Sequence, residues 1–169
     1  MYDVVVVGAG IIGCFIAHDL SKRDIKVALI DKESDVANQA TMANSAMIHS
    51  GHDPLPGTLK AKMNVRGNEM YEDVCKDLGV AFKRTSAFVV ATSVEEESTL
   101  EGLYNQSVER GVPVSWLSGD EARELEPNLS PNVTKAIELP TTGIVSPWEV
   151  SIALAEECVL NGVDLRLEE

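Results

Sequence analysis

The first 31 residues constrain the fold of this chain more than any other stretch. An apolar run from Tyr2 to Val7 leads straight into the glycine-rich segment Gly8–Gly13. A helical pattern follows, and a second apolar run, Val27–Ile30, ends in Asp31. A strand, a glycine-rich turn, a helix and a second strand that ends in an acid form a βαβ unit of the dinucleotide-binding kind. The fold is therefore predicted to be α/β and Rossmann-like.

Each glycine of this motif has its own physical role. Gly8 allows the sharp turn from strand to helix, and Gly10, which lacks a side chain, lets a pyrophosphate approach the backbone. Gly13 lets the helix lie close to the sheet, and the free N–H groups of the first helical turn attract phosphate. Asp31 is positioned to accept a hydrogen bond from a ribose 2′-OH. The motif does not separate NAD from FAD, and a tight turn in another α/β sheet is the alternative interpretation.

The composition fits a globular protein with one packed core. The chain has 169 residues, of which 44% are hydrophobic and 24% charged. A net charge of −13 argues against nucleic acid as a partner. The first apolar run is too short to span a membrane and no basic leader precedes it, so a cytoplasmic location is expected. Cys14, Cys75 and Cys158 form no CxxC pair and are expected to be reduced thiols, and no metal site is predicted.

A long irregular connection is predicted after the βαβ unit. The first helix should cover residues 11–22, with large apolar side chains at helical spacing facing the sheet: Ile12, Phe15, Ile16 and Leu20. The polar stretch from Asp31 to Pro56 then shows no helical pattern. Long irregular connections in compact domains are usually functional, and this one leaves the carboxyl end of the strands, where ligands bind in open α/β sheets.

The rest of the chain mixes helices and strands. A helical stripe runs from Met63 to Leu78, and the segment 87–140 combines short strands and helices without a glycine fingerprint. Ser146 and Pro147 begin a further helix, in which Leu154, Ala155, Cys158 and Val159 should be buried, and a half-buried edge strand should follow it. We predict a first part of the dinucleotide-binding domain at 1–86, a segment of an inserted α+β substrate domain at 87–140, and a return to the first domain at 141–169.

These features together resemble the FAD-dependent oxidoreductases of the D-amino-acid-oxidase superfamily. The resemblance is carried by the opening glycine motif with Asp31, by the segment Asn44–Gly51, by the run Pro56–Lys62, and by Thr142–Pro147. Two branches are similar: the anaerobic-type glycerol-3-phosphate dehydrogenases and the L-2-hydroxyglutarate dehydrogenases. The second shares an asparagine-serine, isoleucine-histidine, glycine loop with this chain.

The resemblance implies FAD as the cofactor and a set of residues that contact it. The glycines would contact the pyrophosphate and Asp31 the adenosine ribose, whereas the loop residues would lie near the pyrophosphate or border the isoalloxazine ring. The full predicted set is Gly8, Gly10, Ile12, Gly13, Asp31, Lys32, Thr41, Asn44, Ser45, His49 and Gly51.

The resemblance also implies oxidation of a small secondary alcohol. Glycerol 3-phosphate is the first choice of substrate, and an L-2-hydroxy acid such as 2-hydroxyglutarate is the second. Many glycerol-3-phosphate dehydrogenases carry an arginine where this chain has His52 and Asp53, and an aspartate would repel a phosphate. His49 is the candidate base for the hydroxyl proton. A histidine that only orders the loop, or a base in sequence outside these residues, are the alternatives.

Members of the resembled family are about twice this length or more. The chain is therefore expected to be an N-terminal piece whose site is completed by a C-terminal half or by a partner subunit. Its first strand would then be an open sheet edge, and we expect weak or no FAD affinity and no turnover from these residues alone. Two other functions remain open: a nicotinamide-binding domain of another oxidoreductase, and a non-catalytic module completed by a partner chain.

Overall fold

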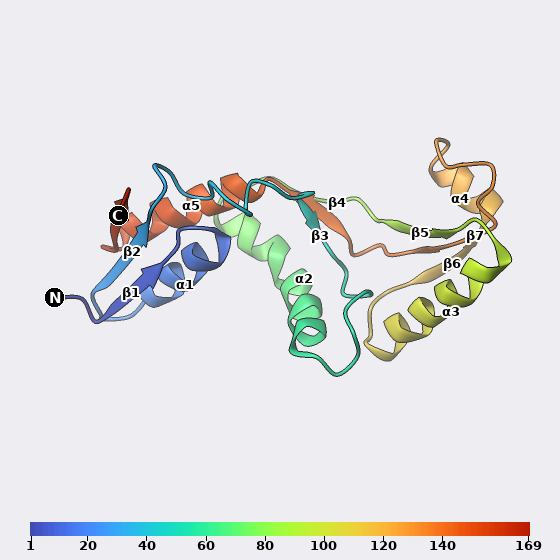
Figure 1. The fold of residues 1–169 in the computed structure, drawn as a ribbon, viewed down its shortest axis with the longest axis horizontal. Helices are drawn as coiled ribbons and strands as arrows, with labels where there is room; N and C mark the ends of the chain where they lie inside the picture. Colours follow the sequence, from blue (N-terminus) through green and yellow to red (C-terminus); the bar gives the residue numbers. More distant parts are fainter. The chain divides into compact units, whose positions relative to one another are not determined.

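The computed structural model describes all of residues 1–169 (Figure 1). The chain forms two compact units: Met1–Ala46, Asp73–Phe82 and Val145–Glu169 make the first, and Met47–Glu72 with Lys83–Ile144 make the second. In chain order the elements are β1 (Val4–Val7), α1 (Ile11–Ser21), β2 (Val27–Asp31), β3 (Met47–Ile48), α2 (Leu59–Asp77), β4 (Phe82–Arg84), β5 (Phe88–Ala91), α3 (Val94–Glu109), β6 (Ser115–Ser118), α4 (Gly119–Leu125), β7 (Lys135–Glu138), β8 (Gly143–Val145), α5 (Pro147–Leu160) and β9 (Asp164–Leu167).

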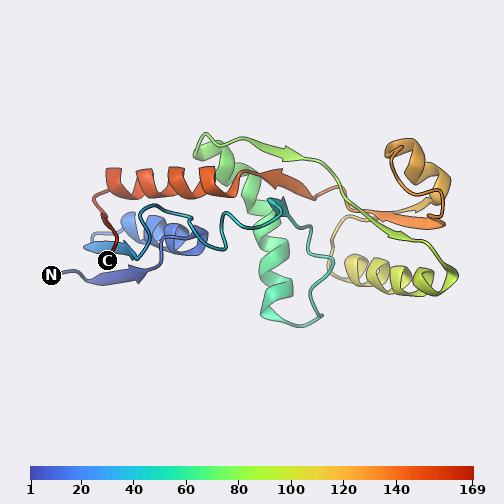
Figure 2. The ribbon, with the colours of Figure 1, turned by 45° about the horizontal axis from the view of Figure 1, so that its top comes forward.

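The first unit is built on a parallel sheet with the strand order β1-β2-β9. Val4 pairs with Val27 along β1 and β2, and Leu29 of β2 pairs with Leu165 of β9. Helices α1 and α5 lie side by side in this unit (Figure 2), and Leu29 and Leu154 are fully buried in its core. The predicted βαβ unit and the α/β fold class are thereby confirmed.

The face of α1 that is buried differs from the predicted one. Ile12 and Ile16 were expected to face the sheet, but they are 74% and 47% exposed. The buried residues of the helix are the small ones, Gly13, Cys14 and Ala17. A helix that approaches a sheet closely has room only for small side chains at the contact, so small residues rather than large apolar ones mark the inner face.

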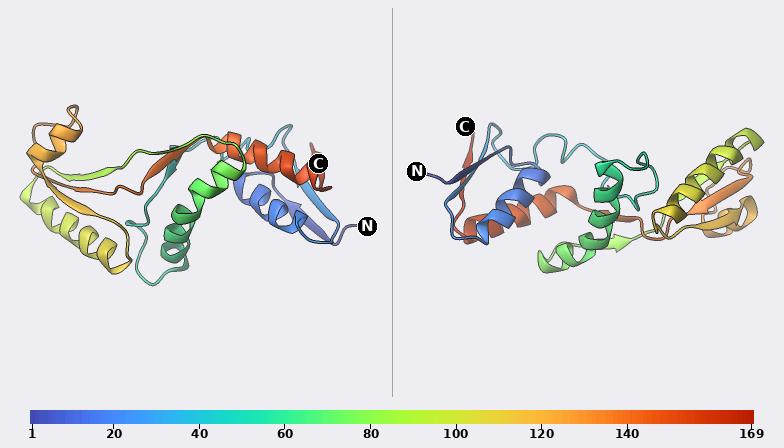
Figure 3. Two further views of the ribbon diagram at one scale, coloured as in Figure 1. Left: turned by 180° about the vertical axis from the view of Figure 1, so that it is seen from behind. Right: turned by 90° about the horizontal axis from the view of Figure 1, so that it is seen from below.

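The second unit contains an antiparallel sheet with the order β5-β7-β6. Helix α3 packs along this sheet (Figure 3), and the buried side chains of Ala91, Leu100 and Ile137 form the core between them. A second small sheet has the order β3-β8-β4. Its strands are two or three residues long, which is too short for an alternating pattern to reveal them in the sequence.

Serine residues cap three of the helices, and the predicted helix start at Ser146 and Pro147 is one of them. The hydroxyls of Ser93, Ser118 and Ser146 each accept a hydrogen bond from the backbone N–H three residues later. Ser118 and Glu121 form a complete capping box, and Pro147 occupies the first turn of α5. These contacts satisfy N–H groups that have no partner inside a helix.

The predicted C-terminal helix and the strand after it are both present, as α5 and β9. Leu154, Ala155 and Cys158 of α5 are buried as predicted, whereas Val159 is 50% exposed, so its assignment to the buried face is wrong. All three cysteines are buried and free.

The division of the chain differs in part from the predicted one. Residues 47–72 group with the second compact unit, although the predicted domain division assigns them to the first part. The boundaries at residues 86 and 140 stay a prediction.

Candidate functional site

The glycine-rich turn joins β1 to α1 with very little free space. Gly8 has a φ of +102°, which favours glycine, and its N–H donates to the carbonyl of Ile30 at 2.7 Å. A Cβ atom on Gly13 would lie 1.8 Å from the carbonyl oxygen of Gly8. A Cβ on Gly10 would lie 3.1 Å from the hydroxyl of Thr41. The turn therefore brings bare backbone to the N-terminus of α1.

Thr41 links the irregular connection to this turn. Its side chain is largely buried, and its hydroxyl accepts a hydrogen bond from the N–H of Ile11 at 3.0 Å. Asn44 holds the next turn, because its Nδ2 donates to the carbonyl of Thr41 at 2.5 Å and its Oδ1 accepts from the N–H of Ala46 at 2.7 Å. The loop after β2 is thus fixed against the first turn of α1.

Asp31 ties the end of β2 to the same turn. Its Oδ2 accepts from the N–H of Ala9 at 2.6 Å, and its Oδ1 accepts from the N–H of Glu33 at 2.9 Å. Each oxygen of a carboxylate has room for a further donor. Asp31 is only half-buried, so a hydroxyl group of a ligand can reach it.

A cavity of about 410 Å³ opens beside the turn in the first unit. The N-cap of α1 is Gly10, which offers no side-chain cap, so the end of the helix presents backbone N–H groups with a partial positive charge. Such a helix end attracts an anion such as a pyrophosphate. The cavity is lined by Val6, Val7, Gly8, Gly10, Ile11, Ile12, Gly13, Ile16, Ala40, Thr41 and Asn44.

The other predicted residues are exposed or belong to the second unit. Ser45 is exposed, and the ammonium of Lys32 lies 3.7 Å from the carboxylate of Glu33 at the surface. His49 and Gly51 are part of the second unit. Their contacts with a flavin ring therefore stay predictions.

His49 and His52 lie close together in the second unit. Their ring centroids are 6.4 Å apart, and the His49 side chain is exposed. Nδ1 of His52 lies 3.1 Å from the hydroxyl of Ser50. Burial lowers the pKa of His52, Asp53 opposes this, and the neighbouring His49 and Arg110 lower it further. His52 is thus held toward its neutral form, in which one ring nitrogen can accept a proton.

This lowered pKa predicts a loss of stability in mild acid. Because His52 has a lower pKa in the folded than in the unfolded chain, the unfolded chain binds more protons as the pH falls below about 6.5. The free energy of unfolding should therefore decrease from pH 7.5 to pH 5.5. Burial also lowers the pKa of His18, which acts in the same direction.

Urea unfolding at the two pH values checks this expectation. His52→Gln should flatten the dependence, and His18→Gln should flatten it by a separate amount, since the two residues lie in different units. A wild-type chain that is equally stable at both pH values would contradict the expectation.

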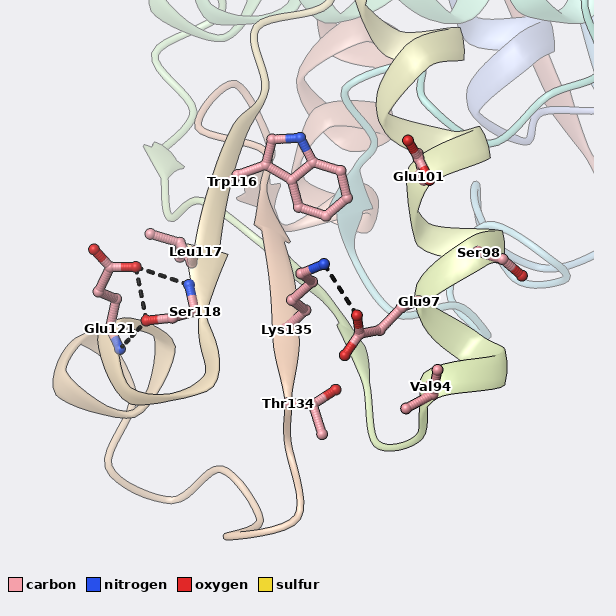
Figure 4. A pocket seen from close by; sticks show the side chains of 10 residues that line it. All are labelled: Val94, Glu97, Ser98, Glu101, Trp116, Leu117, Ser118, Glu121, Thr134 and Lys135. Carbon is pink, nitrogen blue, oxygen red and sulfur yellow. Dashed lines mark hydrogen bonds and ion pairs between the residues drawn. The ribbon is translucent and has the colours of Figure 1, made fainter.

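A further cavity, of about 730 Å³, lies in the second unit between α3 and the sheet. Figure 4 shows Glu97 of α3 and Lys135 of β7 reaching toward each other, with Nζ 3.0 Å from the carboxylate. The ammonium of Lys135 also lies 5.8 Å from the ring centroid of Trp116. The ammonium of Lys135 is therefore already paired, and the cavity is lined by none of the site residues predicted from the sequence.

No group of three or more His, Cys, Asp or Glu residues is arranged to hold a metal ion. None of the helices combines the length and the apolar character that crossing a membrane requires.

The glycine turn, the uncapped helix end and Asp31 define a dinucleotide-binding βαβ unit. The family model described as FAD dependent oxidoreductase matches residues 3–169. The chain belongs to this family of FAD-dependent oxidoreductases, and FAD is the cofactor of the family.

Three individual proteins are similar to this chain over nearly its whole length. Glycerol 3-phosphate dehydrogenase of Caloramator mitchellensis is 49% identical over 99% of this chain, and L-2-hydroxyglutarate dehydrogenase of Escherichia coli strain K12 is 37% identical over 92% of it. The structure of L-alpha-glycerophosphate oxidase from Mycoplasma pneumoniae with FAD bound superposes with a TM-score of 0.95 at 30% identity, over 99% of this chain. The chain spans 35% and 37% of the two dehydrogenases and 44% of the oxidase structure.

Proposed function

We propose that this chain forms the N-terminal, FAD-binding part of a dehydrogenase that oxidises a small secondary alcohol. The observation that carries the proposal is the 49% identity with a glycerol 3-phosphate dehydrogenase over 99% of the chain. Glycerol 3-phosphate is accordingly the first choice of substrate. L-2-hydroxyglutarate is the second, because the dehydrogenases for it reach 37% identity.

The first unit supplies the groups that would bind the ADP half of FAD. Gly10 and the N-terminus of α1 fit a pyrophosphate, because Gly10 has no side chain and caps the helix with none. The hydroxyl of Thr41, which accepts from the N–H of Ile11, borders this position. The free lone pairs of Asp31 would accept from the adenosine ribose, and Gly8 and Gly13 keep the turn tight enough for this arrangement. Ile12 and Lys32 would flank the nucleotide at the surface.

The loop residues would act on the flavin side of the cofactor. Thr41, Asn44 and Ser45 would face the pyrophosphate or the flavin, and Gly51 would border the ring. When bound, FAD supplies the acceptor for the hydride of the alcohol carbon. His49 would hold the hydroxyl proton at a ring nitrogen, since its imidazole is exposed and imidazole is a common general base in enzymes.

His52 and Asp53 bear on the choice of substrate. Asp53 is exposed, and a carboxylate at this position would repel the phosphate of glycerol 3-phosphate and the carboxylates of 2-hydroxyglutarate alike. The proposal therefore requires that another part of the protein bind the anionic group of the substrate. A cytoplasmic location and a partner that completes the site are parts of the same proposal.

Two chimeras test the proposed function. Residues 1–169 replace the matching segment of the Caloramator glycerol 3-phosphate dehydrogenase in one chimera and of the Escherichia coli L-2-hydroxyglutarate dehydrogenase in the other. We expect the first chimera to purify with bound flavin and to oxidise glycerol 3-phosphate in a dye-linked assay. His49→Gln in the same chimera should keep the flavin and lower turnover by about a hundredfold if His49 is the base.

The parent enzymes serve as controls for each chimera. A folded first chimera that is colourless would contradict the proposed FAD-binding role. If only the second chimera is active, L-2-hydroxyglutarate becomes the first choice of substrate and glycerol 3-phosphate the second.

A further inference from the structure

The backbone of the 49–54 loop is held at its start by a buried side chain. Asn68 of α2 is 5% exposed. Its Nδ2 donates to the carbonyl of His49 at 3.1 Å and to the carbonyl of Thr141 at 2.8 Å. Both amide hydrogens of this side chain are therefore used, and one of them fixes the peptide group of His49 itself.

Arg84 locks the orientation of the Asn68 amide. Nη1 of Arg84 donates to Oδ1 of Asn68 at 3.0 Å and also to the carbonyl of Thr141, while Nη2 donates to the backbone carbonyl of Asn68 at 3.1 Å. The Nε atom of Arg84 lies 3.3 Å from the carboxylate of Glu72. A side-chain amide with all three of its polar positions engaged cannot rotate without breaking several hydrogen bonds at once.

The far end of the loop is held independently. Arg110, the C-cap of α3, donates through Nη1 to the carbonyls of Gly51 at 2.9 Å and His52 at 3.1 Å. Gln106 of α3 donates to the carbonyl of His52 at 2.5 Å. A Cβ on Gly51 would lie 2.6 Å from the side chain of Val65, so the middle of the loop is packed against α2. The loop after His49 is thus held by other residues, and His49 is the loop residue whose carbonyl accepts from Asn68.

We infer that Asn68 is a positioning residue for His49, a role that rests on the proposed function of His49 as the base. The His49 side chain is exposed, so its own packing does little to orient the ring. The direction of the ring then depends on the peptide group that Asn68 holds. A general base acts only within hydrogen-bond reach of the proton it removes, so a rotated peptide at His49 would displace the base.

Histidine-selective NMR of the chain tests this inference. The chain contains three histidines, so their ring signals can be separated with His→Gln variants. In Asn68→Asp the acceptor for Arg84 is kept, while the two N–H donors are replaced by an oxygen that repels the carbonyls. We expect the His49 ring signals to shift and broaden, with the His18 signals of the first unit unchanged. Asn68→Ala should give the same result without the added charge.

Glu72→Gln is the matched control, because it removes the ion pair of Arg84 with Glu72 but leaves the contacts of Asn68 intact. It should leave the His49 signals in place. A role of Asn68 in stability alone predicts a lower free energy of unfolding with unchanged His49 signals in the folded chain, and that result would overturn the inference. In the wild-type chain the Nδ2 hydrogens of Asn68 should exchange slowly with solvent. If these hydrogens exchange as fast as those of an amide without hydrogen bonds, Asn68 does not hold His49, and this measurement on the wild-type chain alone would overturn the inference.

Addition of FAD separates this inference from the proposed function. If FAD binds, the His49 signals should respond to FAD in the wild-type chain and respond differently in Asn68→Asp. Because the glycine turn and Asp31 are in place in these residues, we expect weak FAD binding rather than none. A wild-type chain whose signals do not respond to FAD would therefore contradict the proposed function. The displacement of His49 in Asn68→Asp would still decide whether Asn68 positions it.

Discussion

Replacing Gly13 with alanine should lower the free energy of unfolding of the first unit by about 3 kcal/mol or more. The added Cβ would lie 1.8 Å from the carbonyl oxygen and 3.0 Å from the carbonyl carbon of Gly8. Both are backbone atoms of the turn itself, so no side chain can rotate away to make room. The helix would have to move off the sheet, which would also open the phosphate-binding turn. Urea unfolding and nucleotide titration measure the two effects.

Gly102→Ala is the matched control for this change. Gly102 lies inside α3 with no atom within 4 Å of a built Cβ, and alanine favours a helix over glycine by about 1 kcal/mol. Gly102→Ala should therefore stabilise the chain slightly. A Gly13→Ala chain as stable as wild type would contradict the close helix–strand contact.

Replacing Asp31 with alanine should have the second largest effect, on stability and on nucleotide binding together. The carboxylate accepts from the N–H groups of Ala9 and Glu33, and a hydrogen bond to a charged group contributes about 1.5–3 kcal/mol. Asp31 is half-buried, so we expect a loss near the lower end, about 2 kcal/mol. Loss of the ribose acceptor should also weaken ADP binding by about tenfold.

Asp31→Asn separates the two roles of this residue. It keeps one acceptor oxygen of the same shape but removes the negative charge, so we expect a smaller loss of stability than in Asp31→Ala. Equal ADP affinity in wild type and Asp31→Ala, measured by calorimetry on folded protein, would show that Asp31 does not bind the nucleotide.

Local sequence patterns predicted the glycine turn because the interacting groups are neighbours along the chain. The turn, the helix start and the acid lie within one βαβ unit, whose geometry is set by steric rules that act over a few residues. The same reasoning failed for the inner face of α1. Helical periodicity favoured the large side chains of Ile12 and Ile16, but the contact distance set by Gly13 leaves room only for small ones.

The anchors of the 49–54 loop could not be predicted from the sequence. Asn68 reaches the carbonyl of Thr141 across 73 positions, and Arg110 reaches that of Gly51 across 59. Both side chains donate to backbone carbonyls, which every residue has, so no residue type at the partner position signals the contact. The hydrophilic character of these residues suggests solvent exposure, and only the folded chain reveals that Asn68 is buried.

The measurement that tests the account most directly is an amide NMR titration of the 169-residue chain with FAD, ADP and FMN. It detects the weak binding expected of these residues alone and reports where it occurs. We expect FAD and ADP to shift the amide signals of Gly8–Gly13, Asp31 and Thr41, whereas FMN, which lacks the adenosine and one of the two phosphates, should shift them much less. Unchanged signals at these positions with FAD and ADP, or an equal response to FMN, would contradict the claim that the first unit binds the ADP half of FAD.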